Sequence, residues 1–502
     1  MFDSVTHPSY TEWTATHVDA VLTDVISPLA WTLLGSAVER SQARVWSLLG
    51  VIPTIDDDRF RFLARLGGRM HISVTSLRQV AARMPGVDPS RIDAELGLDT
   101  ANAQGVTWRD RLRYPRVVVG SLRLFGLVPV RLRRQRRHLQ AAVESTPGPD
   151  ATPADLVARI ERLRRGIPGV FVPHFVVRMM THGALDELRR LCVDDDLAFG
   201  LLADLPGLVA TEPSLALHRL ADEARRTAHV DEDALDAFIA RYGHRGVNEL
   251  DPTVAVWDQQ RQGLRAMIEQ LAAGASNDPA ARARAVHAQA RRKLAEVRRV
   301  RRWRIRAAAR AARTLQLLGE RSKDDIVRYV HEIRLALRQL GDHLSARIDP
   351  VDAALLSWSE LRRLAVDGEP LTVDLGERRR ELAGCSTDQL PDPSAGKGES
   401  LQGIAASPGH GTGRAVVVDD PLTATEDGDV LVAHATDAAW IPLFLGKSAV
   451  VMDVGGVISH ASIVARDLGI PAVVGTEVAT TLIRTGDHTD VDGDRGLVTI
   501  RR

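Results

Sequence analysis

A histidine follows a pair of glycines and a serine in the segment VMDVGGVISHASIVARDLGIP. The apolar run before Gly455 and Gly456 predicts a buried strand, and the two glycines allow a tight turn. Ser459 is a natural N-cap, so His460 is expected in the first turn of the next helix. Unpaired N–H groups and the positive end of the helix dipole favour a bound phosphate at this position.

A neutral imidazole at such a position can attack a phosphoryl group and later release it, which is nucleophilic catalysis in two steps. The helix dipole disfavours the imidazolium form, so the ring stays nucleophilic near neutral pH. The same local pattern also fits a histidine that merely caps a helix. The short segment therefore leaves both interpretations open.

A longer motif favours the chemical interpretation. The segment resembles the phosphohistidine, or swivelling, domain of PEP-utilising enzymes such as PEP synthase, pyruvate phosphate dikinase and rifamycin phosphotransferase. Their pattern GG-x-x-[ST]-H-x-[AS]-I-x-A-R-x-L-G-I-P-A-[VI]-V-G is matched by Gly455, Gly456, Ser459, His460, Ser462, Ile463, Ala465, Arg466, Leu468, Gly469, Ile470, Pro471, Ala472, Val474 and Gly475. The resemblance covers residues 400–502 and implies that His460 carries a phosphoryl group.

The resemblance also suggests which residues surround that phosphate: Gly455, Gly456, Ser459, Ser462 and Arg466. Ser462 lies in the first turn and could offer its N–H. Arg466 lies about 240° round an ideal helix from His460, so it cannot reach the phosphate along one helix face. A structural role for Arg466 is therefore equally open.

The helical half carries a second candidate site. The segment RYGHRGVNELDPTVAVW resembles part of the substrate-binding region of rifamycin phosphotransferases. Arg245 could hold a phosphate or carboxylate bidentately, and His244 or Glu249 could act as a base. We expect an acceptor to bind near these three residues, with Trp257 as a wall. The alternative is a polar loop that joins helices.

The elements that position these residues fall into two domains. Residues 391–400, PDPSAGKGES, have the composition of a flexible linker. Residues 1–390 show mostly helical patterns, including a helix capped by Thr152, one over 279–319 and one over 322–341. Residues 401–502 alternate short β-branched runs with turns. The predicted fold class is α + α/β, a large helical substrate-type domain followed by a small β/β/α swivelling domain.

Composition limits the partners. The chain has 502 residues, with 65 basic and 65 acidic side chains, so its charge gives no general argument for nucleic acid or membranes. The arginine-rich stretch over 291–313 is therefore interpreted as a solvated helix face. Two cysteines, no signal peptide and no long apolar run predict a soluble, cytoplasmic protein.

These features together predict a phosphotransferase subunit. Enzymes of this kind normally carry an ATP-grasp domain, which we do not recognise in this sequence. We therefore expect a separate ATP-grasp protein to hold ATP and Mg²⁺, and no cofactor or metal in this chain. His460 would carry the phosphoryl group to a small-molecule acceptor in the helical domain. The alternative is a non-catalytic phosphohistidine carrier or regulatory module that binds a protein partner.

Overall fold

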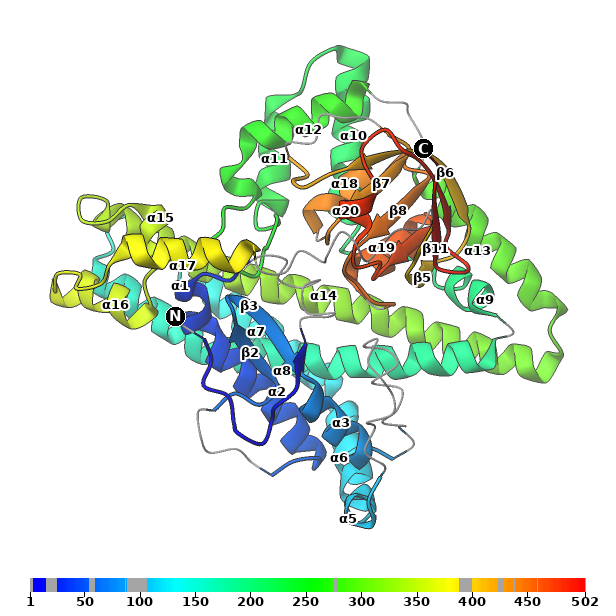
Figure 1. Ribbon diagram of the computed structural model, residues 1–502, viewed down its shortest axis with the longest axis horizontal. Helices are drawn as coiled ribbons and strands as arrows, with labels where there is room; N and C mark the ends of the chain where they lie inside the picture. Colours follow the sequence, from blue (N-terminus) through cyan, green and yellow to red (C-terminus); the bar gives the residue numbers. More distant parts are fainter. Residues whose placement is uncertain are drawn as a thin grey trace.

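The computed structural model describes residues 3–14, 25–53, 59–85, 87, 106–192, 194–273, 279–387, 400–422, 428–436, 438–457 and 459–501. Helices dominate the part up to residue 387, and a mixed sheet forms most of the part from residue 400 on (Figure 1). This arrangement confirms the predicted fold class. Apart from Ser400, the predicted linker lies outside the described residues. None of the described helices is both long and apolar enough to cross a lipid bilayer.

Two long helices, α8 (Pro153–Leu191) and α14 (Arg299–Leu344), form the centre of the helical domain (Figure 1). Thr152 caps α8 as predicted, because its side chain accepts a hydrogen bond from the backbone N–H of Asp155. Apolar side chains of both helices share one buried cluster, which includes Ile160, Ile167, Ile326, Val330 and Ile333. Burial of this apolar surface holds the two helices together.

The boundaries predicted around α14 are wrong. The sequence predicts one helix over 279–319 and another over 322–341, whereas the structure has α13 (Pro279–Glu296) and an α14 that continues through Gly319 and Ser322. Tertiary packing explains the continuity. A Cβ on Gly319 would lie 3.8 Å from the side chain of Arg178 on α8. Ser322 is buried and donates its hydroxyl to Gln135 at 2.9 Å. Both residues therefore serve helix packing rather than helix ends.

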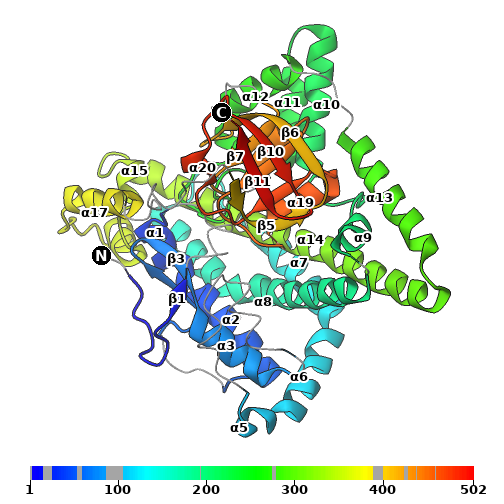
Figure 2. The same cartoon turned by 45° about the vertical axis from the view of Figure 1, so that its right-hand side comes forward.

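The N-terminal part adds a small sheet and further helices around this pair (Figures 1 and 2). The sheet was not predicted; its antiparallel strands have the order β1-β3-β2. The elements are β1 (Trp13–Thr14), α1 (Pro28–Ala30), η1 (Trp31–Gly35), α2 (Ser36–Leu49), β2 (Leu63–Leu66), β3 (Arg69–Ser73), α3 (Val74–Arg83), α5 (Trp108–Arg111), α6 (Tyr114–Gly126) and α7 (Val128–Glu144).

The remaining helical elements of this part follow α8 or α14 along the chain. They are α9 (Asp195–Gly200), α10 (Glu212–Thr227), α11 (Glu232–Tyr242), η3 (Trp257–Gln259), α12 (Arg261–Ala273), α15 (Pro350–Ala353), α16 (Trp358–Arg362), η4 (Arg363–Asp367) and α17 (Leu375–Thr387). Helix α11 begins with acidic residues and ends before Gly243, as the sequence predicts.

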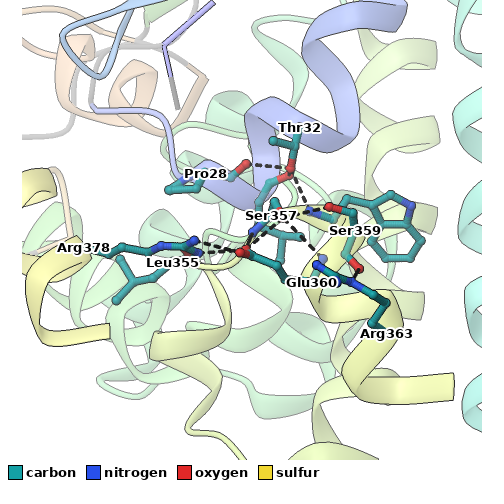
Figure 3. A network of polar contacts seen from close by, with 10 residues as sticks. Pro28, Thr32, Leu355, Ser357, Ser359, Glu360, Arg363 and Arg378 are labelled. Atoms are coloured by element: carbon teal, nitrogen blue, oxygen red, sulfur yellow. Dashed lines mark hydrogen bonds and ion pairs between the residues drawn. The ribbon is translucent and has the colours of Figure 1, made fainter. Parts of the chain in front are cut away.

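Figure 3 shows how the N-terminal helices are tied to α16 and α17. Ser357 caps α16, and Glu360 accepts a hydrogen bond from the backbone N–H of Ser357. Arg378 of α17 donates to both carboxylate oxygens of Glu360 at 2.7 Å. These hydrogen bonds, the Arg378 pair foremost, lower the pKa of Glu360 to about 2. Thr32 accepts from the backbone N–H of Trp358 at 2.8 Å, which closes the network.

The C-terminal domain contains one eight-stranded sheet with the order β4-β11-β10-β6-β7-β8-β9-β5. Strands β6 to β9 are parallel neighbours, and the other pairs are antiparallel. The strands are β4 (Ser400–Gln402), β5 (Ile404–Ser407), β6 (His410–Val417), β7 (Val430–Ala433), β8 (Ala449–Met452), β9 (Ala472–Val474), β10 (His488–Asp492) and β11 (Leu497–Arg501). The helical elements are η6 (Ala438–Trp440), α18 (Ile441–Phe444), α19 (His460–Leu468) and α20 (Ala479–Leu482). The short β-branched runs noted over 401–502 form strands, as predicted.

Candidate active site

The turn before α19 has the geometry that its sequence predicts. Strand β8 ends at Met452, and Gly455 has φ +146°, a backbone conformation that favours glycine. Ser459 is the N-cap of α19, and Gly469 ends the helix in the left-handed conformation. His460 is therefore the first residue of α19, where backbone N–H groups lack partners within the helix. The side chain of His460 lies outside what the structure describes.

The two serines next to this histidine hold the turn together. The Ser459 hydroxyl accepts a hydrogen bond from the backbone N–H of Ser462 at 3.3 Å and lies 2.9 Å from the Ser462 hydroxyl. Ser462 is fully buried and donates its hydroxyl to the carbonyl of Gly456 at 2.8 Å. These contacts give both serines a positioning role. Contact with a phosphate stays a prediction.

Arg466, on another face of α19, also stabilises the turn before this helix. Its Nε donates to the carbonyl of Ser462 at 2.9 Å, and Nη2 donates to the carbonyl of Val457. The guanidinium carbon lies 4.8 Å from the ring centre of Phe199 on α9, a cation–π contact. Burial, together with the nearby Arg189, lowers the pKa of Arg466 to about 9, so it stays charged near neutral pH. Arg466 thus links the turn to the helical domain.

The next residue, Asp467, fixes α19 to the segment between α9 and α10. Its Oδ1 accepts a hydrogen bond from the backbone N–H of Leu205 at 2.6 Å, and Oδ2 accepts from the Thr211 hydroxyl at 3.3 Å. Leu205 and Leu208 belong to the same buried apolar cluster as the core of the C-terminal domain. Burial raises the pKa of Asp467 to about 6. The C-terminal domain is therefore docked on the helical domain through α19 (Figure 2).

The predicted acceptor loop lies beside α14. His244 Nε2 is 3.0 Å from Asp324 Oδ1, and Arg245 donates to the same oxygen at 3.1 Å. Arg245 also pairs with Glu249 at 3.0 Å, and Lys323 lies 3.6 Å from Glu249. The side chains of Arg245 and Glu249 are each only 3% exposed. The structure therefore places this pair in an internal ion network, whereas His244 borders open space.

That open space is a pocket of about 620 Å³ between α7, α11 and α14. Its polar lining includes Arg136, Gln140, His244, Asp258, Arg328, His331 and Glu332, and its apolar lining includes Leu139, Val143, Ile239 and Ala240. Arg245, Glu249 and Trp257 are not among the lining residues. Trp257 is fully buried and packs on Phe238, with ring centres 5.6 Å apart.

The pocket combines neutral imidazoles with cations. Burial, together with the neighbouring arginines and His244, lowers the pKa of His331 to about 3. Burial also lowers the pKa of His244, against the opposing effect of Asp324. Both rings are therefore neutral at pH 7. The Arg328 and Arg136 side chains are 41% and 64% exposed, so both can meet an anionic group entering the pocket.

Sequence reasoning missed the contribution of α14. Asp324, Arg328 and His331 stand at positions i, i+4 and i+7, which places them on one helix face. That spacing was the available signal. Nothing in the sequence, however, pairs this face with a loop that lies about 80 residues earlier.

A β-sheet domain with a histidine at a helix start is thus docked on a helical domain that carries a polar pocket. Comparison with known families identifies the relatives. Residues 425–496 match the PEP-utilising enzyme, mobile domain, and residues 170–321 match the rifampicin phosphotransferase fourth domain. The chain is therefore related to the PEP-utilising enzymes, as its motifs predict.

Individual relatives agree with this result. A probable phosphoenolpyruvate synthase of Pyrococcus horikoshii is 51% identical over 100 residues, 20% of this chain and 12% of that protein. The rifampicin phosphotransferase of Streptomyces sviceus is 29% identical over 386 residues, 63% of this chain and 42% of the relative. The prodigiosin synthesizing transferase PigC of Serratia marcescens is 46% identical over 105 residues. The matched region thus spans less than half of each of these relatives.

Proposed function

We propose that this chain is a phosphotransferase subunit in which His460 carries a phosphoryl group to a small molecule bound in the helical domain. The observation that carries the proposal is the capped turn that places His460 at the start of α19, within a segment matched by the PEP-utilising mobile domain. We further propose that a separate ATP-grasp protein donates the phosphoryl group and holds ATP and Mg²⁺.

The transfer has two balanced steps. In the first, a P–O bond of ATP breaks while a P–N bond to His460 forms, and the remaining nucleotide leaves with the electron pair of the broken bond. In the second, that P–N bond breaks while an acceptor oxygen bonds to phosphorus and gives up its proton. His244, which lines the pocket with its Nε2 3.0 Å from Asp324, is suited to accept this proton. Arg328 and Arg136 are suited to neutralise the transferred phosphoryl group.

The docked position requires the carrier to move. Val457, in the turn before α19, packs against a cluster that includes Ala312 of α14. Arg328 lies further along the same helix, about 24 Å away at 1.5 Å per residue. We therefore propose that the C-terminal domain leaves this docked position to reach the pocket.

Phosphorylation of His460 is tested directly. Wild type, His460→Ala and His488→Ala are each incubated with labelled ATP and a candidate ATP-grasp protein encoded beside this chain's gene. His488 is an exposed histidine of the same domain and serves as the control. We expect acid-labile, base-stable label on wild type and His488→Ala only. Equal label on His460→Ala would refute the proposal.

The acceptor site is best tested at Arg328. Arg245→Ala would strip a buried cation from Glu249 and Asp324, a change that costs about 3–5 kcal/mol and confounds folding with catalysis. Arg328→Ala removes a half-exposed pocket cation instead. We expect about a tenfold or greater loss of phosphoryl transfer with unchanged His460 labelling. Arg306→Ala, an exposed arginine of the same helix, should transfer normally.

The donor assignment predicts weak nucleotide binding by this chain alone. Calorimetric titration with ATP and Mg²⁺ should show no binding tighter than about millimolar, or about 4 kcal/mol. Micromolar binding would place the nucleotide site on this chain and remove the need for a separate donor. Labelling of His460 without transfer to any small molecule would instead favour a carrier or regulatory module.

A further inference from the structure

A second group of ligand-type side chains lies at the opposite end of the C-terminal sheet from the strand ends that precede α19. His410 begins β6, Asp492 ends β10, and Asp494 follows in the turn to β11. His410 and Asp492 are direct partners across the two antiparallel strands. One imidazole nitrogen and one oxygen of each carboxylate all lie within 4.8 Å of one another.

Backbone amides orient both carboxylates. Asp492 Oδ1 accepts hydrogen bonds from the N–H groups of Asp494 at 3.1 Å and Arg495 at 2.9 Å. Asp494 Oδ1 accepts from the N–H of Gly409 at 2.6 Å. The other Asp494 oxygen, Oδ2, is the one nearest to His410. The strand ends thus hold the two carboxylates in place around the imidazole.

The spacing of these atoms suits an ion better than a direct hydrogen bond. His410 Nε2 lies 3.7 Å from Asp492 Oδ1 and 3.7 Å from Asp494 Oδ2. A hydrogen bond between these atoms would be about 2.7–3.2 Å long. Metal–ligand bonds of about 2.0–2.2 Å place neighbouring ligands of a tetrahedral ion about 3.4 Å apart. Small side-chain shifts therefore suffice to close the three groups around one cation.

A fourth carboxylate comes from the helical domain. The carboxyl group of Asp196, in the first turn of α9, lies beside that of Asp494. Lys293 of α13 lies 3.4 Å from Asp196 and offsets part of the charge. Two carboxyl groups from different domains thus meet beside an imidazole, where a divalent cation would remove their mutual repulsion.

We propose that His410, Asp492 and Asp494, together with Asp196 of the helical domain, bind a divalent transition-metal cation at the junction of the two domains. One imidazole with several carboxylates is a ligand set for ions such as Zn²⁺ or Mn²⁺ rather than for Ca²⁺, which takes oxygen ligands only. The cation joins the C-terminal domain to α9 and so favours the docked position. We expected no metal in this chain from its sequence; His410 and Asp196 lie far from Asp492 and Asp494 along the sequence.

The first experiment measures metal binding by the full chain. Protein freed of metal with a chelator is titrated calorimetrically with ZnCl₂ and with MnCl₂. We expect one site for one of these ions, weakened at least tenfold in both His410→Ala and Asp494→Asn. His488→Ala and Asp490→Asn, which alter the same strand β10, are matched controls and should bind as wild type. Binding that is absent, or unchanged in His410→Ala and Asp494→Asn, would overturn the proposal.

The second experiment tests the position between the domains. Hydrogen exchange of α9 and of the turn over 492–495 is followed with and without the bound metal. We expect metal to slow exchange in both segments of wild type, and Asp196→Asn to weaken metal binding. Because Asp196 is partly exposed, this variant should keep its fold, which circular dichroism verifies. Protection of the 492–495 turn alone would overturn the bridging role. Neither experiment depends on phosphorylation of His460.

Discussion

Replacing Asp467 by alanine should weaken the docking of the C-terminal domain. The carboxylate is 7% exposed and accepts hydrogen bonds from the backbone N–H of Leu205 and the hydroxyl of Thr211. Alanine leaves the Leu205 N–H without an acceptor, which costs about 1–3 kcal/mol when the group stays buried. The ratio of docked to undocked protein should then fall about 5- to 150-fold. Arg313 donates to the carbonyls of Leu201 and Ala203, so the segment itself should keep its shape.

Asp467→Asn is the matched variant. Its amide oxygen can still accept from Leu205, and the Thr211 hydroxyl can rotate to accept from the amide nitrogen. Hydrogen exchange of the peptide over 205–211 reports docking, because the Leu205 amide is itself bonded across the interface. We expect faster exchange in Asp467→Ala, and exchange no faster than wild type in Asp467→Asn. Equal protection in wild type and Asp467→Ala would refute the reasoning.

Three further outcomes follow from the geometry. Burial raises the pKa of Asp467 to about 6 in the docked state, so docking should weaken as pH rises through 6. Hydrogen exchange of the peptide over 205–211 measures this pH dependence, which should vanish in Asp467→Asn. Arg378→Ala should lower the melting temperature at pH 7. The difference from wild type should shrink as pH falls from about 4.5 to about 2, because the stabilisation from the low pKa of Glu360 is lost in that range. Calorimetry at several pH values checks this. Gly455→Ala should cost about 1–3 kcal/mol through its φ of +146° and reduce His460 labelling, whereas Gly341→Ala, a helical position with open space, should leave labelling unchanged.

Local signals made the turn before α19 predictable. The strand, the N-cap Ser459 and the terminal Gly469 each act within a few residues, so the sequence contains the information that shapes them. The same holds for Thr152 at the start of α8. Helix geometry alone predicts that Arg466 does not share a helix face with His460, and Arg466 donates to the carbonyls of Ser462 and Val457.

The helical domain was less predictable because its polar residues find partners far along the chain. Arg245 has the sequence context of a substrate-binding cation, yet Asp324 and Glu249 surround it. Ser322 resembles a helix cap, yet it bonds to Gln135 on another helix. Such pairings depend on how α7, α8 and α14 pack, and one sequence contains no direct record of that packing.

The length of α14 sets a mechanical requirement on the proposed transfer. Its 46 residues form a helix about 69 Å long. This helix borders the docked C-terminal domain near Ala312 and the pocket near Arg328. Because α14 is buried against α8 over its middle, it bends little. The docking position and the pocket therefore keep a constant separation. The connecting segment over 388–399 reaches at most about 40 Å when fully extended. Each deleted residue shortens this limit by about 3.3–3.6 Å, so deletions there should slow phosphoryl transfer before they affect the docking position or the pocket.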